Sequence, residues 1–302
     1  MNPLSLALDW TPNINHIGFF VAQEKGFYKN LGLDVKLIDP SDDNYQLTPA
    51  KKVELGLADF ALCPTESVIS YRTKAKPIEL IAVAALLQED LSAIVVKNDS
   101  SIQSPKDLDG KSYASYQARY EDEIVRQMIK NAGGKGNIEV NYPQKLGIWN
   151  TVLEGNFDAT WIFMNWEGVE AESKEVDLTY FKMKDYNVPY SYSPVIATTA
   201  ANIKTKRKAY VDFLTATKEG YLYSANHPEA SAHLLKKSVP THDQNIDLNK
   251  ALAITKHHFG NREDWGKMKE EVISEFLHWI YERKLEVQKV GVAEIMTNEL
   301  IK

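Results

Sequence analysis

Cysteines, basic clusters and long apolar runs are scarce in this sequence. A single cysteine, Cys63, occurs in 302 residues, which excludes an internal disulfide, a cysteine-based zinc site and an iron–sulfur cluster. No apolar stretch approaches the roughly 20 residues needed to cross a bilayer, so we expect no membrane span. The net charge of -6 and the absence of basic runs argue against binding of nucleic acid or of an anionic membrane surface.

Familiar catalytic and metal-binding motifs are lacking as well. The chain has no Gly-x-Ser-x-Gly, no His-Glu-x-x-His and no phosphate-binding loop. His257 and His258 are adjacent, so on a helix they point about 100° apart, unlike two metal ligands one turn apart. We therefore predict no metal site.

The composition is that of an ordinary globular protein, with 44% hydrophobic and 25% charged residues. The length exceeds what one simple core usually organises, which favours two lobes. Apolar runs of strand length alternate with helical patterns, as in parallel βαβ units, and the chain becomes mainly helical after residue 203. We predict an α/β fold with two lobes, each a mainly parallel sheet flanked by helices.

One pattern occurs twice. The stretches "VELGLADFALC" (53–63) and "VLEGNFDATWIF" (152–163) share a helix end, a Gly, two residues, an Asp and a strand. Gly56 and Gly155 suit the left-handed position that ends a helix. Each lobe is therefore predicted to contain the same supersecondary unit.

The lobes need not be continuous in sequence. A mostly helical tail cannot easily build a third sheet, so we expect it to pack on the first lobe. We predict lobe 1 from residues 1–90 and 194–302, with residues 91–193 inserted as lobe 2.

Candidate ligand-binding residues follow the first strand. Ligands bind outside the carboxyl ends of strands in open parallel sheets. Trp10 stands at such an end and offers a flat face for a ring, while hydrogen-bonding groups surround it at Asp9, Asn13, Asn15 and His16. In the alternative interpretation, Trp10 fills the core and Asp9 caps the turn. Whether His16 contacts ligand or caps the following helix also stays open.

Pro64, Thr65 and Glu66 stand at the end of the equivalent later strand. Thr65 can cap the next helix, whose terminal amides attract anions. Glu66 suits an amino-substituted ring; in the alternative interpretation it only complements the helix dipole.

In the second lobe, Asn165, Trp166 and Glu167 follow the apolar run 161–164, which is typical of a buried strand. A tryptophan and a carboxylate there mirror the first lobe, which favours ligand contact. Tyrosines in two further loops can stack on a ring or hydrogen-bond to it, although tyrosines are common in exposed loops. These are Tyr116, Tyr190 and Tyr192.

The opening "LDWTPNINHIGFFVAQEKGFYKNLGLDVKL" resembles that of the NMT1/THI5-like proteins. This group includes pyrimidine-precursor binding proteins of thiamine salvage and the fungal thiamine pyrimidine synthases. The stretches "GLADFALCPTESV", "SPKDLDGK", "LEGNFDATWIFMNWEG" and "DYNVPYSYSPVIATT" follow in the family's order, so the resemblance covers most of residues 3–230.

The resemblance implies a type II periplasmic-binding-protein fold, whose two lobes close by a hinge on a ligand between them. It also implies an aminopyrimidine held by aromatic stacking and a carboxylate, with Trp10, and Glu167 beside Trp166, at matching positions. We predict a monomeric, non-catalytic solute-binding protein for a pyrimidine-like small molecule, with an ABC transporter permease as partner if the protein is exported.

The resemblance also covers an enzyme branch. Those synthases hold pyridoxal phosphate on a lysine and consume a histidine in the stretch matching 61–73, where this chain has neither residue. Their cysteine-rich, iron-linked motif corresponds to 189–193, here Pro-Tyr-Ser-Tyr-Ser. We therefore expect no cofactor and no catalytic residue. A synthase-type enzyme, or a binding protein for another small aromatic or sulfonate, remains the alternative.

The first predicted strand follows Met1 almost at once, so the chain as written shows no signal peptide. We expect a cytoplasmic protein if Met1 is the native start. If an export segment was removed, the expected location is periplasmic or lipid-anchored outside the cytoplasm.

Overall fold

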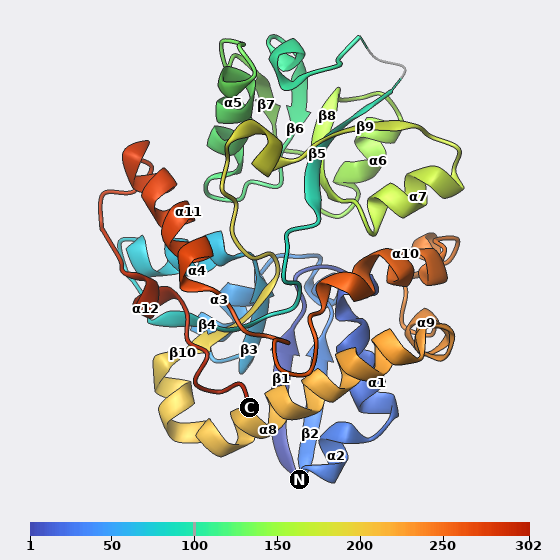
Figure 1. Ribbon diagram of the computed structural model, residues 1–302, viewed down its shortest axis with the longest axis vertical. Coiled ribbons are helices and arrows are strands. Elements are labelled where there is room, and N and C mark those ends of the chain that lie inside the picture. The colour runs from blue at the N-terminus through green and yellow to red at the C-terminus, as the bar shows by residue number, and fades with distance from the viewer. Residues whose placement is uncertain (99–100) are drawn as a thin grey trace.

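The computed structural model describes residues 1–98 and 101–302. It has two lobes, each built on a five-stranded sheet flanked by helices (Figure 1). The predicted two-lobed α/β architecture is confirmed.

The first sheet has the strand order β2-β1-β3-β10-β4. Its strands are β1 (Asn2–Ala7), β2 (Leu33–Ile38), β3 (Phe60–Cys63), β4 (Leu80–Ala85) and β10 (Val195–Thr199). Strand β1 pairs in parallel with β2 and β3, whereas β10 runs antiparallel between β3 and β4. We call the lobe with this first sheet the lower lobe and the lobe with the second sheet the upper lobe, as they stand in Figure 1. Strand β10 brings the chain back from the upper lobe into the first sheet, and it therefore runs opposite to its neighbours.

The second sheet has the order β7-β6-β8-β5-β9. Its strands are β5 (Ser92–Lys97), β6 (Ser112–Ala114), β7 (Glu139–Asn141), β8 (Ala159–Phe163) and β9 (Leu178–Phe181). Strand β6 pairs in parallel with β7 and β8, and β5 runs antiparallel between β8 and β9. The two sheets therefore share one plan, in which β6, β7 and β8 correspond to β1, β2 and β3.

Helices cover the faces of both sheets (Figure 1). Those before β10 are α1 (Ile17–Glu24), α2 (Phe27–Asn30), α3 (Pro49–Glu54), α4 (Thr65–Thr73), α5 (Glu121–Asn131), α6 (Ile148–Leu153) and α7 (Glu167–Ser173). Those after it are α8 (Ala200–Asn226), α9 (Pro228–Lys236), α10 (Leu248–Thr255), α11 (Glu270–Glu282) and α12 (Val292–Ile295). The helical tail surrounds the lower lobe.

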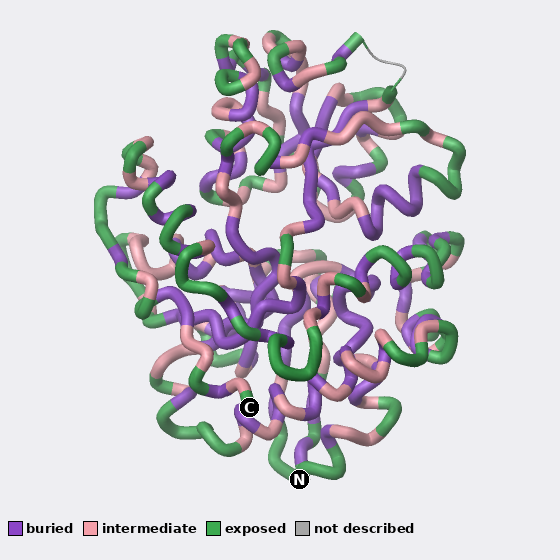
Figure 2. Tube along the Cα trace, in the orientation of Figure 1, coloured by how far each residue is buried: buried purple, intermediate pink, exposed green. Residues whose placement is uncertain are grey.

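Helices α1 and α8 approach so closely that two glycines meet. A Cβ built on Gly220 would lie 2.0 Å from the carbonyl oxygen of Gly18. Below this contact, Phe213 stacks on Phe60 of β3 with ring centroids 4.4 Å apart. Figure 2 shows that burial is concentrated in the strands, and exposure in the outer helices and turns.

The repeated sequence pattern forms the same structure in both lobes. Gly56 and Gly155 have φ of 71° and 78°, the left-handed conformation predicted for them. Asp59 Oδ2 accepts a hydrogen bond from the backbone N–H of Ser5 in β1 at 2.9 Å. Asp158 Oδ2 does the same with Ser112 of β6 at 2.8 Å. Each aspartate therefore fastens the start of β3 or β8 to its parallel neighbour.

Candidate ligand-binding site

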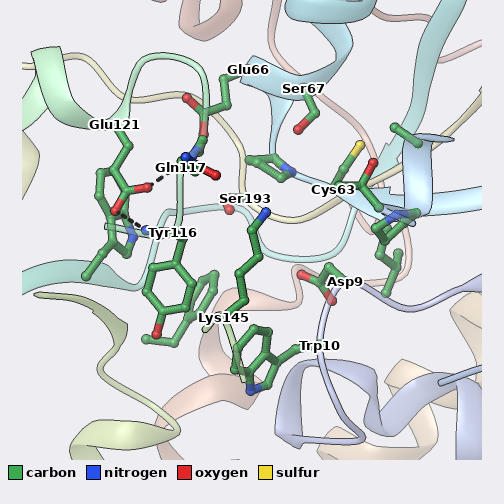
Figure 3. A pocket seen from close by; sticks show the side chains of 18 of the residues that line it. Asp9, Trp10, Cys63, Glu66, Ser67, Tyr116, Gln117, Glu121, Lys145 and Ser193 are labelled. Carbon is green, nitrogen blue, oxygen red and sulfur yellow. Dashed lines mark hydrogen bonds between the residues drawn. The ribbon is translucent and has the colours of Figure 1, made fainter. Parts of the chain in front are cut away.

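A cavity of about 400 Å³ lies between the lobes, where the carboxyl ends of parallel strands from both sheets converge (Figure 3). The loops after β1 and β3 form its lower wall, and those after β6 and β8 form its upper wall. Nine of the residues expected at the site line it: Asp9, Trp10, Asn13, Pro64, Glu66, Tyr116, Trp166, Glu167 and Tyr190.

Trp10 stands in the wall of this cavity and is only partly buried. Its ring centroid lies 5.7 Å from that of Tyr116, with the planes at 78°, so the two lobes meet edge to face. The ring centroid of Tyr45 lies 5.9 Å from that of Trp10, with the planes at 54°. The core-filling interpretation of Trp10 therefore does not describe this structure, and the side chain is available to stack on a ring.

Asp9 is oriented by His16. The backbone N–H of Asn13 donates to His16 Nδ1 at 3.3 Å, so Nε2 carries the proton and donates to Asp9 Oδ1 at 2.7 Å. His16 is fully buried and lies outside the cavity lining. In this structure His16 caps the turn before α1 and orients the carboxylate.

Two carboxyl groups face the cavity from opposite lobes. Glu66, in the first turn of α4, is 4% exposed, and its Oε2 has no hydrogen-bond partner among the described residues. Burial, with a smaller contribution from Glu121, raises the pKa of Glu66 to about 8. Glu167 begins α7 and its Oε2 accepts from the Phe163 N–H at 2.9 Å, while burial raises its pKa to about 8. Near neutral pH each side chain is mainly a carboxylic acid, which can both donate and accept.

Besides His16, three of the expected residues lie outside the lining and make structural contacts instead. Thr65 donates its hydroxyl proton to the Tyr192 carbonyl at 2.8 Å, and the Tyr192 hydroxyl accepts from the Lys269 N–H at 2.9 Å. Asn165 donates to Asn15 Oδ1 at 2.7 Å, which joins the upper lobe to the lower one.

Trp166 lines the cavity but is only 3% exposed and belongs to the main hydrophobic cluster of the lower lobe. Most of its surface therefore packs between the lobes.

Comparison with known proteins agrees with this architecture. The family model described as NMT1/THI5 like matches residues 13–231. This chain belongs to the NMT1/THI5-like family.

Two relatives of this NMT1/THI5-like protein bear names connected with thiamine. A Haemophilus influenzae protein named for thiamine biosynthesis is 28% identical over 74% of this chain and 70% of its own length. A formylaminopyrimidine-binding protein of Halalkalibacterium halodurans is 26% identical over 78% of this chain and 70% of its own. The periplasmic aliphatic sulphonate-binding protein SsuA of Escherichia coli shares the fold, with a TM-score of 0.69, 16% identity, and coverage of 97% of this chain and 91% of its own. The family resemblance and the periplasmic-binding-protein fold predicted from the sequence are confirmed.

The cavity of this NMT1/THI5-like protein also contains residues that were not predicted from the sequence. Trp161 of β8 lines the cavity, and its ring centroid lies 5.0 Å from that of Tyr190. Tyr45 and Lys145 stand in the loops after β2 and β7, which are equivalent strands of the two sheets. Because ligands bind outside the carboxyl ends of strands, the sequence could have indicated both loops as parts of the site. It could not have indicated which side chain of each loop faces the cavity.

The residues present do not fit a cofactor bound as in the synthase branch. At the stretch where that resemblance implies a lysine, the cavity of this NMT1/THI5-like protein has Cys63, Glu66 and Ser67, none of which carries an amine. Burial raises the pKa of the Cys63 thiol. Within residues 1–98 and 101–302, no group of three or more His, Cys, Asp and Glu side chains could hold a metal ion, and no helix is long and apolar enough to cross a membrane.

Proposed function

We propose that this protein binds an amino-substituted pyrimidine related to thiamine between its two lobes, without chemical conversion. One observation carries the proposal: Glu66 and Glu167 face one aromatic cavity from opposite lobes, each with a pKa raised to about 8. We take lobe 1 as residues 1–90 with 194–302, and lobe 2 as residues 91–193.

A protonated carboxyl group complements the edge of a 4-aminopyrimidine. The amino group donates and the adjacent ring nitrogen accepts, while the acid accepts through its carbonyl and donates through its hydroxyl. Glu66 suits this pairing because its Oε2 is buried and unpartnered in the described part of the chain. Trp10 and Tyr116 supply aromatic surface beside it, and a ring held there touches both lobes.

The names of the relatives support this ligand class, since one is called a formylaminopyrimidine-binding protein. Proteins of this fold include periplasmic solute-binding proteins such as SsuA. We therefore propose a monomer that acts outside the cytoplasm and delivers its ligand to an ABC transporter permease.

Calorimetric titration with 4-amino-5-hydroxymethyl-2-methylpyrimidine and with formylaminopyrimidine tests the proposal, using protein unfolded and refolded to remove any solute carried through purification. We expect one site per chain. Glu66→Leu should weaken binding about 10- to 100-fold, because a ligand donor and acceptor lose their partner. Glu66→Gln keeps a donor and an acceptor of similar size and should retain most of the affinity.

Heat on adding an alkanesulfonate, with none for either pyrimidine, would replace the proposed ligand by a sulfonate. A synthase-type enzyme would instead give the absorbance band of a Schiff base when pyridoxal phosphate is added. We expect a flat spectrum.

A further inference from the structure

Lys145 is a cationic side chain in the cavity that the proposed pyrimidine contacts do not use. It stands in the loop between β7 and α6 and belongs to the cavity lining. In Figure 3 its side chain extends into the cavity between Tyr116 and Asp9, above Trp10. Its Nζ lies 5.3 Å from the centre of the Tyr45 ring, which belongs to the opposite lobe.

The charged groups around Lys145 already have partners or are close to neutral. The charge of Glu121 acts on Lys145, but this carboxylate accepts hydrogen bonds from the Tyr113 hydroxyl and from the Tyr116 and Ala118 N–H groups. Asp9 accepts from His16 at 2.7 Å, and Arg119 Nε lies 2.5 Å from Glu286. Glu66 and Glu167 are mainly protonated near pH 7 because their pKa values are raised to about 8. In the described part of the chain, no ion pair joins Lys145 to a carboxylate, and its contact with Tyr45 is a cation–π contact.

An ammonium group that loses water without gaining a counter-charge is destabilised. Burial lowers the pKa of Lys145, and the charge of Glu121 offsets this only in part. An anion hydrogen-bonded to Nζ would offset the remaining desolvation. A negatively charged group on the ligand can therefore supply the hydrogen-bonding partner that the Lys145 ammonium lacks among the described residues.

We propose that Lys145 is the recognition site for an acidic substituent on the bound ring, so that the preferred ligand is an aminopyrimidine bearing a carboxylate or a phosphate ester. This rests on the proposed function and specifies its ligand class. The ring edge pairs with the carboxyl groups, its face lies on Trp10, and the acid accepts hydrogen bonds from the ammonium. A carboxylate carries one negative charge and a phosphate monoester up to two. Comparing the affinities of the two acids therefore shows how binding depends on the charge of the substituent.

Calorimetry with three ligands that share one ring tests the subsite. They are 4-amino-5-hydroxymethyl-2-methylpyrimidine, its phosphate ester, and 4-amino-2-methylpyrimidine-5-carboxylic acid. We expect at least one acid to bind the wild-type protein about tenfold or more tightly than the alcohol, because hydrogen bonds between charged groups are strong. Lys145→Met keeps an unbranched side chain of nearly the same length that can still pack on Tyr45, but it removes the charge, and should bring the tighter acid to within about threefold of the alcohol.

Two matched variants separate charge from packing. Lys145→Arg should keep most of the preference for the acid. Lys106→Met removes an exposed lysine elsewhere in the upper lobe and should change no affinity.

Equal binding of the alcohol and both acids by the wild-type protein would overturn the subsite and leave the proposed function standing. The subsite is also overturned if Lys145→Met weakens the alcohol and the acids by the same factor, since Lys145 would then be only part of the wall. Binding of none of the three ligands would overturn the proposed function together with the subsite.

Discussion

Glu66 should make the stability of the folded protein depend on pH, and Glu66→Gln should remove that dependence. The pKa of this carboxyl rises from an ordinary 4.5 to about 8 in the folded chain. Between these values the folded state holds a proton that the unfolded state has lost, so rising pH favours unfolding. Each pH unit costs about 1.4 kcal/mol in this window, which amounts to about 4 kcal/mol at most between about pH 5 and pH 8.

Urea unfolding of the ligand-free protein across this pH range measures the effect. Glutamine has nearly the same shape and does not titrate, so the free energy of unfolding of Glu66→Gln should rise relative to wild type as the pH increases. Glu167 is present in both proteins, so its own contribution cancels. Parallel pH profiles for the two proteins would show that Glu66 is ionised in the folded state and would refute the reasoning on its burial.

Three further changes probe the walls and the packing. Trp10→Ala should weaken pyrimidine binding about tenfold, from lost stacking, with the midpoint of thermal unfolding unchanged; a large fall in that midpoint would return Trp10 to a core role. Glu286→Gln weakens the contacts with Arg119 and Tyr120 next to the Tyr116 loop and should speed ligand release in stopped-flow measurements, whereas Glu299→Gln, in an exposed ion pair, should not; equal release rates would argue against this support. Gly220→Ala should destabilise the fold by about 2 kcal/mol or more in urea unfolding, because its methyl group would overlap α1, and an unchanged midpoint would mean that α8 can shift.

The architecture was accessible from the sequence because its signals are local and repeated. Gly56 and Gly155 mark helix ends, and the aspartates that follow mark strand starts, so two equivalent units could be predicted. The reversed direction of β10 could not, since it depends on where the chain returns from the second lobe.

The site was accessible in part for the same reason. Asp9, Glu66 and Glu167 lie two to four residues after β1, β3 and β8, the inner strands whose carboxyl ends meet at the cavity, so the topology brings them there. Tyr45 and Lys145 follow the edge strands β2 and β7, in loops whose course depends on packing across the cleft, so spacing from the strand end does not single them out. Tyr45 also has a φ of 59°, a left-handed conformation that no glycine announces in the sequence.

The single cysteine can serve as a chemical probe for the opening of the two lobes. Cys63 ends β3 in the cavity wall and is 3% exposed, so we expect a thiol-specific reagent to reach it only through the opening of the lobes that the proposed function implies. Every chain carries one such thiol, so the labelling curve has a single amplitude and needs no correction for competing sites. When the lobes reclose faster than the reagent reacts, the labelling rate is the fraction of open molecules multiplied by the reactivity of the exposed thiol. A bound solute should slow that rate in proportion to its occupancy.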